Sequence, residues 1–534
     1  MTGLQGIEQE ANHSPQSLSL FSGKAWPWLV LFAFVYTALV VPHWNLGHLD
    51  FGDGNYMYIS WRMSQGAVLY RDILAPQPPM HLLVGAAIAR IGTLLPLPHP
   101  LYAFRAFSLM LHLATMVLLY RVALRITDGP EAGISSRRAR LAGLIACAVY
   151  LLLPIGFWWT LGYQSQPLLV FFLMLTFYLQ LKGCVACSVA SGITGALAAL
   201  TNMTTAPYLL LLAGYNLVRR PRLLLPFVLP LALIIAMVII GAELYTHAYL
   251  DNVIRNQVGA FPRKELLPPG ENALTYALSK LYREGTEVLR LEAGYLVLAC
   301  LGLAVYAQRA PVPVRGLTVL FTLASFGAIV YVAKGGTVNY VFSVSEPYVA
   351  LMVGYFVAAV AHAWWPRWRA TQVSDFSPLA GGVAVVLAVF CVTWVGLQHS
   401  WRTLKQDTYE LPEAETLRIV DQIKSNCPQD GVTLAPPFYA FLAQRRIAAD
   451  YSELLLWKLK YMNETVDREH GRAHEIIAKL AAMIREKRIS FMALDMDQTY
   501  MIPEIKEAVD ANYAPQLEKP FRTLNTPIMF YKPK

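Results

Sequence analysis

Acidic and basic side chains alternate with glycines and aromatic residues in the segment LDFGDGNYMYISWRMSQGAVLYRDILAPQPP, which runs from Leu49 to Pro79. The segment follows an apolar, uncharged stretch from Ala25 to Val41 that has the length of a membrane span. A carboxylate about ten residues beyond such a span lies near the lipid headgroups and not in the hydrocarbon. The pattern therefore predicts polar chemistry at a bilayer surface.

Asp53 is the candidate catalytic residue of this segment. Asp50 and Asp53 flank Phe51-Gly52, and the glycines at 52 and 54 allow a sharp turn and a close approach of the backbone to a ligand. A carboxylate in this position can act as a general base that accepts the proton of a hydroxyl group. The alternative is a loop of solvated acids, in which Asp53 only caps a surface helix expected at residues 54–66.

A phosphate-bearing substrate needs cations, and five basic side chains are candidates. Arg62 and Arg71 come first, because a guanidinium can grip a phosphate with two parallel hydrogen bonds. The alternative for each is an arginine that extends to the lipid headgroups. The other candidates are Arg263, Lys264 and Lys334, and for Arg263 and Lys264 a solvated external loop is the favoured interpretation.

Further polar side chains are expected to contact the substrate: Asp50, Tyr56, Asp72, Gln77, Gln164, Gln166, Asn339 and Tyr340. His48 with Asp50 and Asp53 offers imidazole and carboxylate ligands to a divalent metal, but their spacing matches no specific motif, so we assign no metal site. A divalent metal cofactor is left open. Trp158, Trp159 and Tyr163 are expected to form an aromatic belt at the membrane surface, and His112 to be a packed core residue.

The composition places the chain among multi-pass membrane proteins. Its 534 residues are 56% hydrophobic and 15% charged, with a mean hydropathy of +0.41, which is too apolar for a soluble globular protein. The net charge of +9 comes with arginines in short connectors between apolar stretches, so it argues against nucleic-acid binding. Cys184 and Cys187 form a CxxC that we interpret as one turn of a helix, with no disulfide framework, metal or redox role.

The distribution of basic residues favours one topology. If residues 81–97 crossed the membrane, the connector from Arg121 to Arg140, which has five arginines, would face outside against the positive-inside tendency. With residues 81–93 as an amphipathic or re-entrant surface segment, this connector and the later basic connectors become cytoplasmic. About eleven spans follow, near residues 25–43, 100–121, 140–158, 166–182, 186–203, 205–218, 223–247, 291–307, 315–333, 347–364 and 378–398.

We therefore expect an α-helical polytopic membrane protein with a small C-terminal α/β domain. Residues 1–24 form a cytoplasmic tail, residues 25–400 a transmembrane domain with external loops at 44–99 and 248–290, and residues 401–534 an external domain. In the external domain, residues 413–425 and 502–510 have helical periodicity, and GVTLA, ISFMALD and TPIMFYK are typical of strands.

The segment from residue 49 to 79 resembles the first external loop of the GT-C membrane glycosyltransferases, such as the protein O-mannosyltransferases and the aminoarabinose transferases that act on lipid A. The shared pattern is an acid after the first span, a tyrosine, a Gly-x-x-x-Tyr-Arg-Asp segment and a Pro-Pro pair. The resemblance extends to Arg105, to Asn339-Tyr340 with Pro347, and to APPFYAFLAQRR at residues 435–446.

The resemblance implies that the chain transfers a sugar from a polyprenyl-phosphate carrier to an acceptor on the outer face of the membrane, with Asp53 as the catalytic carboxylate. The chain departs from the family pattern at Gly54, where many relatives have Glu, and at Gln77, where many have Lys. Gln164 and Gln166 stand where relatives often place an acid.

The favoured function is thus an inverting glycosyltransferase of a bacterial cytoplasmic membrane, with a lipid, polysaccharide or protein acceptor. A single base without a second nucleophilic carboxylate favours a single displacement, and a phosphate leaving group needs no general acid. A transporter or flippase of a lipid-linked glycan is the alternative, but such proteins tend to have ionisable residues in mid-membrane. A ligand-binding sensor is a third interpretation that leaves the first loop without a role.

Overall fold

The computed structural model describes residues 25–47, 49, 51–128, 136–255, 272–327, 342–370, 398, 411–451, 472–496, 499–517, 519–521 and 527–534. Seven candidate residues of the sequence analysis lie outside the described residues: His48, Asp50, Arg263, Lys264, Lys334, Asn339 and Tyr340. The expected span at residues 378–398 also lies outside them, apart from its last residue.

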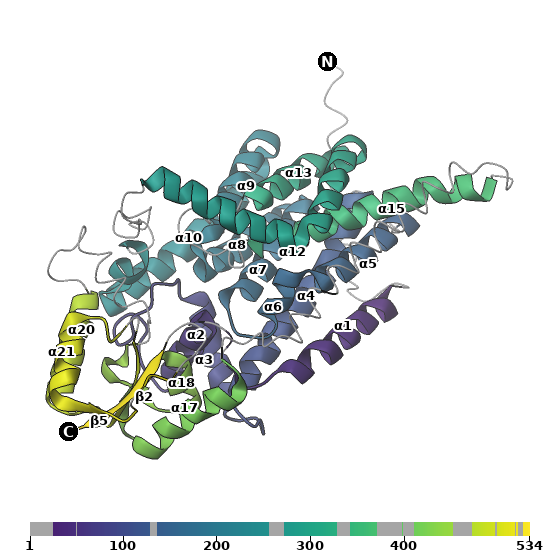
Figure 1. Cartoon of the computed structure of the whole chain (residues 1–534). Coiled ribbons are helices and arrows are strands. Elements are labelled where there is room, and N and C mark those ends of the chain that lie inside the picture. The colour runs from purple at the N-terminus through teal and green to yellow at the C-terminus, as the bar shows by residue number, and fades with distance from the viewer. Residues whose placement is uncertain are drawn as a thin grey trace.

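Most of the described chain forms a bundle of apolar helices (Figure 1). The bundle contains α1 (Trp26–Val40), α4 (Leu101–Asp128), α5 (Arg137–Leu152), α6 (Pro154–Trp159), α7 (Ser165–Lys182), α8 (Val185–Thr201), α9 (Ala206–Arg219), α10 (Pro221–Thr246), α12 (Ala273–Arg309), α13 (Val312–Gly327) and α15 (Glu346–Ala370). Three short helical turns accompany them: η2 (Val41–His43) follows α1, η3 (Met203–Thr205) lies between α8 and α9, and η4 (Leu250–Arg255) follows α10. Polar caps begin several of these helices: the Ser136 side chain accepts a hydrogen bond from the Ala139 N–H, and the Asn272 side chain accepts one from the Thr275 N–H.

Six of the described helices are long and apolar enough to cross a membrane, so the chain is a multi-pass membrane protein. They are α1 with η2, α4, α7, α10, most of α12, and the first part of α15, while α3, α8 and residues 314–327 of α13 are apolar but shorter. These lengths alone do not establish the expected number of about eleven spans. The structure also extends the expected span at residues 291–307, because α12 begins at Ala273 and no proline interrupts its 37 residues.

Two helices lie between α1 and α4, and both were expected at the membrane surface. α2 (Phe51–Ser64) confirms the helix expected at 54–66, although it begins three residues earlier. α3 (Met80–Gly92) has 13 residues and is about 20 Å long, too short for a hydrocarbon layer of about 30 Å. Its length supports the topology in which residues 81–93 do not cross.

The C-terminal region is an α/β domain that packs beside α2 and α3 (Figure 1). It contains α17 (Glu413–Asn426), β1 (Val432–Leu434), α18 (Pro437–Ala443), β2 (Arg446–Ile447), η7 (Ala448–Asp450), α20 (Arg472–Arg485), β3 (Phe491–Asp495), α21 (Pro503–Asn512), β4 (Tyr513–Pro515) and β5 (Ile528–Pro533). The strands form one sheet in the order β2-β1-β3-β5-β4, with β1 parallel to β2 and β3 and with β5 antiparallel to β3 and β4. The predicted helices at α17 and α21 and the predicted strands at β1, β3 and β5 are confirmed.

Two apolar cores hold the described residues together. One lies inside the helical bundle, where Tyr36, Phe177 and Tyr348 are buried. The other passes without a break from α2, α3 and the start of α4 into the C-terminal sheet, and contains Trp61 and Phe441. The C-terminal domain therefore packs on the membrane domain through a shared core.

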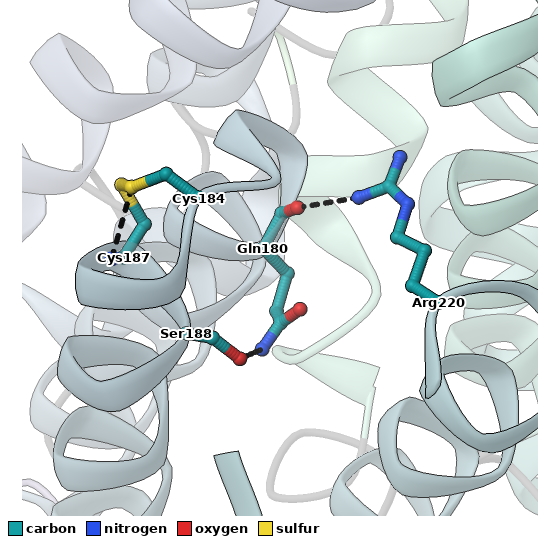
Figure 2. Close-up of a disulfide and its surroundings, with 5 residues drawn as sticks. All are labelled: Gln180, Cys184, Cys187, Ser188 and Arg220. Carbon is teal, nitrogen blue, oxygen red and sulfur yellow. Dashed lines mark hydrogen bonds between the residues drawn. A yellow bond between two sulfur atoms is a disulfide. The ribbon is translucent and has the colours of Figure 1, made fainter. Parts of the chain in front are cut away.

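The interpretation of Cys184 and Cys187 as a plain helical turn is wrong, because the structure joins them in a disulfide with a Cα–Cα distance of 5.1 Å (Figure 2). Gly183, at a φ of +70°, ends α7, and Cys184 is then the extended N-cap of α8. This geometry turns the Cys184 side chain over the first turn of α8, where its sulfur also accepts a hydrogen bond from the Cys187 N–H at 3.1 Å. Nearby, Arg220 donates to the Gln180 carbonyl oxygen at 3.0 Å.

Candidate active site

Asp53 lies in the first turn of α2, and its side chain is completely buried. Its Oδ1 atom accepts a hydrogen bond from the backbone N–H of Tyr163, in the loop that joins α6 to α7. A Cβ atom added at Gly162 would lie 2.9 Å from this oxygen, so the loop can approach the carboxylate this closely only with glycine at that position. Asp53 is thus buried, so the expectation of a solvated acid is wrong, and it lies within α2, which begins at Phe51 and not at residue 54.

The loop that contacts Asp53 also makes hydrogen bonds to several neighbouring elements through Thr160 and Tyr163. Trp44 donates through Nε1 to the Thr160 carbonyl oxygen at 3.2 Å, and the Tyr36 and Thr160 hydroxyl groups lie 3.3 Å apart. The Tyr163 hydroxyl donates to the carbonyl oxygen of His81 at 2.5 Å. These contacts fix the loop against α1, the end of the first span, and α3.

The expected aromatic belt is wrong for two of its three members. Trp159 and Tyr163 are buried, and only Trp158 is partly exposed. The reason is that α6 and the loop after it pack inside the protein, with Trp159 in the core of the bundle and Tyr163 in the core shared with the C-terminal domain. His112 is confirmed as a packed residue, since it is buried between the rings of Tyr36 and Tyr150, at centroid distances of 5.2 and 4.4 Å.

Two candidate substrate contacts lie in the shell around Asp53. Tyr56 is buried and packs edge-on against His81, with ring centroids 4.6 Å apart. Burial lowers the pKa of His81 to about 3, so this imidazole is neutral near pH 7. Gln164 follows Tyr163 directly and is buried.

The other two glutamines predicted to contact the substrate are Gln166 and Gln77. Gln166 is buried in the first turn of α7, where its Oε1 atom lies 3.3 Å from the Ser165 hydroxyl. Gln77 is partly exposed, and its carbonyl oxygen accepts a hydrogen bond from the Tyr70 hydroxyl at 2.8 Å. The structure thus places Gln164 and Gln166 beside the loop that contacts Asp53, and Gln77 in the turn that leads to α3.

The two leading candidates for phosphate binding are in ion pairs. Arg62, with a side chain that is 9% exposed, pairs with Asp450 of the C-terminal domain at 2.9 Å and donates to Gln65 at 2.6 Å. Arg71 is half exposed and pairs with Asp72 through two hydrogen bonds of 2.9 and 3.1 Å. Asp72 raises the pKa of Arg71, so the guanidinium is fully charged. Asp72 also accepts a hydrogen bond from the Val68 N–H and so stabilises the turn after α2.

The C-terminal domain packs directly on the helix that carries Asp53. A Cβ atom added at Gly54 would lie 2.4 Å from the Cβ atom of Phe438 in α18, so a larger residue at this position would displace the domain. The Tyr58 hydroxyl accepts a hydrogen bond from the Ile447 N–H at 2.7 Å. The departure from the family pattern at Gly54 therefore has a steric reason in this chain.

Two buried carboxylates were not among the residues predicted from the sequence. Glu292 of α12 and Glu346 of α15 are 1% and 2% exposed, and Glu346 accepts a hydrogen bond from the Gly156 N–H through Oε1. An acid at the edge of an apolar stretch is itself a signal, because such residues are costly to bury in a membrane protein. Both acids stand beside the expected spans at residues 291–307 and 347–364, and neither was a candidate site residue.

Arg105 was not among the predicted site residues either. It is the largest completely buried side chain of the described residues, and it donates to the carbonyl oxygen of Asn45 at the end of the first span. Among the described residues, no group of three or more His, Cys, Asp or Glu side chains could hold a metal ion. Of the trio considered for a metal, only Asp53 belongs to the described residues.

Comparison with solved structures gives the class of this fold. The chain is similar to ArnT from Cupriavidus metallidurans bound to undecaprenyl phosphate, with a TM-score of 0.62 at 14% identity over 95% of this chain and 98% of that chain. It is also similar to the oligosaccharyltransferase of Archaeoglobus fulgidus tethered with an acceptor peptide, with a TM-score of 0.54 at 13% identity over 92% of this chain and 72% of that chain.

The oligosaccharyltransferase AglB from Archaeoglobus fulgidus, in complex with an inhibitory peptide and a dolichol-phosphate, gives a TM-score of 0.50 at 13% identity over 92% of this chain and 72% of that chain. These are glycosyltransferases with the GT-C fold, and the present chain has the GT-C fold. The fold that the first external loop suggested is thereby confirmed. No family model and no curated protein matches the sequence.

Proposed function

We propose that this protein is a membrane glycosyltransferase that transfers a sugar from a polyprenyl-phosphate donor to an acceptor hydroxyl group, with Asp53 as the general base. The observation that carries the proposal is the buried Asp53 carboxylate, which the Tyr163 N–H orients where α2 meets the bundle of a GT-C fold. ArnT bound to undecaprenyl phosphate and the archaeal enzyme with dolichol-phosphate support a lipid-phosphate donor.

In the proposed reaction, the acceptor oxygen attacks the anomeric carbon as the bond from that carbon to the phosphate oxygen breaks. The bonding electrons leave with the polyprenyl phosphate, and Asp53 takes the acceptor proton. Because the phosphate is a stable leaving group once its charge is balanced, no second carboxylate is required, and the sugar inverts at the anomeric carbon.

The proposed phosphate ligands are Arg62, Arg71, Arg263, Lys264 and Lys334. For Arg62, phosphate would replace or share the ion pair with Asp450, so donor binding would be coupled to the C-terminal domain. Arg71 is the more accessible of the two, since its side chain is 52% exposed. The proposed contacts to sugar or acceptor are Asp50, Tyr56, Asp72, Gln77, Gln164, Gln166, Asn339 and Tyr340.

An apolar cavity of about 460 Å³ lies between the end of α3 and the start of α4. Among its lining residues are Trp44, Ile88, Leu95, Tyr102 and Phe107. Trp44, which lines this cavity, also donates a hydrogen bond to the carbonyl oxygen of Thr160, in the segment that leads to the Tyr163 contact with Asp53. A hydrocarbon chain of a lipid substrate is the kind of group that such a lining accepts.

We also propose that the reaction takes place on the outer face of a bacterial cytoplasmic membrane. In that arrangement residues 1–24 are a cytoplasmic tail, residues 25–400 are the transmembrane domain, and residues 401–534 are an external domain that helps to cover the site. The ion pair and the shared core between α2 and the C-terminal domain support this role for the domain. The acceptor can be a lipid, a polysaccharide or a protein.

The test compares the purified wild-type protein with Asp53→Asn in lipid nanodiscs that contain a polyprenyl-phosphate sugar. We expect kcat to fall by at least about 100-fold, while donor affinity stays within about two-fold, because the amide keeps the shape of the side chain but cannot accept the proton. Near-normal turnover would remove Asp53 as the base. Mass analysis of envelope glycans with and without the protein would identify the sugar and the acceptor.

The alternative function, transport of a lipid-linked glycan, gains one argument from the two buried carboxylates. Glu292 and Glu346 are ionisable groups inside the bundle, a feature common in transporters. Movement of a labelled lipid-linked sugar between the leaflets of proteoliposomes, without transfer to any acceptor, would favour this alternative over the glycosyltransferase.

A further inference from the structure

The buried carboxylate of Glu346 contacts the same short segment that orients Asp53. Glu346 is the first residue of α15, and its Oε1 atom accepts a hydrogen bond from the backbone N–H of Gly156 in α6. A Cβ atom added at Gly156 would lie 2.6 Å from the other carboxylate oxygen, Oε2. The carboxylate is therefore packed directly against the backbone, and in this geometry there is no space for a side chain at position 156.

Groups from three other elements surround this contact. Glu292 of α12 lies close to the backbone of Ile155 and interacts electrostatically with Glu346. The phenol groups of Tyr36 in α1 and Tyr150 in α5 also interact electrostatically with Glu346. A carboxylate is costly to bury among these groups unless it makes hydrogen bonds. The presence of a buried acid at position 346 therefore points to a specific role for its hydrogen bond with Gly156.

The segment from residue 154 to 163 joins Glu346 to Asp53. At one end Gly156 donates to Glu346, and at the other end Tyr163 donates to Asp53. Between them, Thr160 is held by the hydroxyl of Tyr36 and by the indole of Trp44. Such a short, buried segment has little freedom to absorb a shift at one end, so its displacement at Gly156 changes the position of the Tyr163 N–H.

We infer that Glu346 is a positioning residue for Asp53, which acts by holding the segment 154–163 at Gly156 so that the Tyr163 N–H stays on the Asp53 carboxylate. The inference deepens the proposed glycosyl transfer and rests on it. Glu346 touches neither substrate nor Asp53 in this scheme. Its effect passes through the backbone between residues 156 and 163.

The test compares Glu346→Ala and Glu346→Gln with the wild type in nanodiscs. The amide oxygen of Gln can still accept from the Gly156 N–H, so we expect kcat of this variant within about three-fold of wild type. Alanine removes the acceptor, and we expect kcat to fall by about 10- to 100-fold with donor Kd unchanged, which is the scale of a small misplacement of a catalytic group. Ser345→Ala is the matched control, because Ser345 is also completely buried but donates to the Ser325 carbonyl oxygen.

The pH dependence of kcat separates positioning from a loss of folded protein. A backbone N–H that donates to a carboxylate favours the ionised form, so loss of the Tyr163 contact moves the acidic limb of the pH profile to higher pH in Glu346→Ala. A smaller folded fraction lowers the whole profile and leaves this limb in place. The inference would be overturned if the acidic limb of the kcat profile stayed in place and kcat fell equally in the Ala and Gln variants.

Hydrogen exchange gives a readout that does not depend on activity. We expect the amides of residues 155–163 to exchange at least about ten-fold faster in Glu346→Ala than in wild type or Ser345→Ala. Exchange at the wild-type rate would overturn the inference even if activity fell. If wild-type protein transfers no sugar at all, the proposed function fails instead, and the exchange rates alone decide whether Glu346 holds the segment.

Discussion

At the scale of single residues, the candidate chemistry depends on glycines that let carboxylates lie against backbone. Gly162 allows Asp53 to meet the loop before α7, and Gly156 does the same for Glu346. In both places the carboxylate accepts a hydrogen bond from a backbone N–H, of Tyr163 and of Gly156 itself. A backbone N–H has less conformational freedom than a side-chain donor, so it holds the carboxylate in a better defined orientation.

Gly162→Ala tests the first of these close approaches. Its Cβ atom would lie 2.4 Å from a methyl carbon of Leu49 and 2.9 Å from Oδ1 of Asp53, so the loop or the carboxylate must move. We expect kcat to fall by about 10- to 100-fold with a smaller effect on donor affinity. Gly214→Ala is the control, because its added Cβ atom meets nothing within 4 Å. Equal activity of the two variants in the transfer assay would show that the contact with Gly162 is dispensable.

At the scale of elements, local patterns in the sequence predicted most of what the structure shows. The helical spacing after Asp53 predicted α2, and alternating or continuous apolar runs predicted β1, β3 and β5. The start of α12 was missed because the charged residues before position 291 are typical of a loop, although Leu, Lys, Arg and Glu are also good helix formers.

Contacts between distant elements could not be predicted from these local patterns. Asp53 and Tyr163 are 110 positions apart, and Tyr58 and Ile447 are 389 apart. The residue types made Asp53 a candidate, but periodicity and spacing do not show which loop returns to it. The disulfide at Cys184 was missed for a different reason, since it depends on the extended N-cap conformation of that one residue.

The junction between α3 and α4 gives a pH-dependent prediction. His99 caps α4 by accepting a hydrogen bond from the Leu101 N–H through Nδ1 at 3.1 Å, and it packs edge-on against Phe441 of α18. Burial lowers the pKa of His99 to about 4 from the ordinary value of 6.5. The unfolded chain therefore binds the proton more readily, so stability is complete above pH 6.5 and is lost as the pH falls toward 4.

We expect this loss to be on the order of 2 kcal/mol, since each unit of pKa difference corresponds to about 1.4 kcal/mol and His99 keeps some exposure. His99→Asn keeps a side-chain acceptor for the cap and does not titrate in this range. Its thermal unfolding temperature should therefore fall less than that of the wild type between pH 7 and pH 4.5. Parallel pH dependence of the two proteins would exclude His99 as a source of the acid sensitivity.

At the scale of the whole molecule, the membrane domain and the C-terminal domain are parts of one packed body. The core that contains Trp61 of α2 also contains Phe441 of α18 and Phe491 of β3. Polar contacts at its edge join Arg62 to Asp450 and the Leu46 N–H to Glu413. The helix that carries Asp53 is thus enclosed by the loop before α7 on one side and by the C-terminal domain on another.

Deletion of residues 411–534 should therefore destabilise the membrane domain and not only remove a cover. The deletion exposes the buried faces of Tyr58, Trp61 and Phe104, and an apolar surface of this kind promotes association. We expect aggregation or a clearly lower unfolding temperature in size-exclusion and thermal-unfolding measurements in detergent. Asp450→Ala in the full chain is the control, because it removes the ion pair with Arg62 but leaves the shared core. We expect it to remain monodisperse, whereas a truncated chain as stable as the full protein would show that the two domains fold independently.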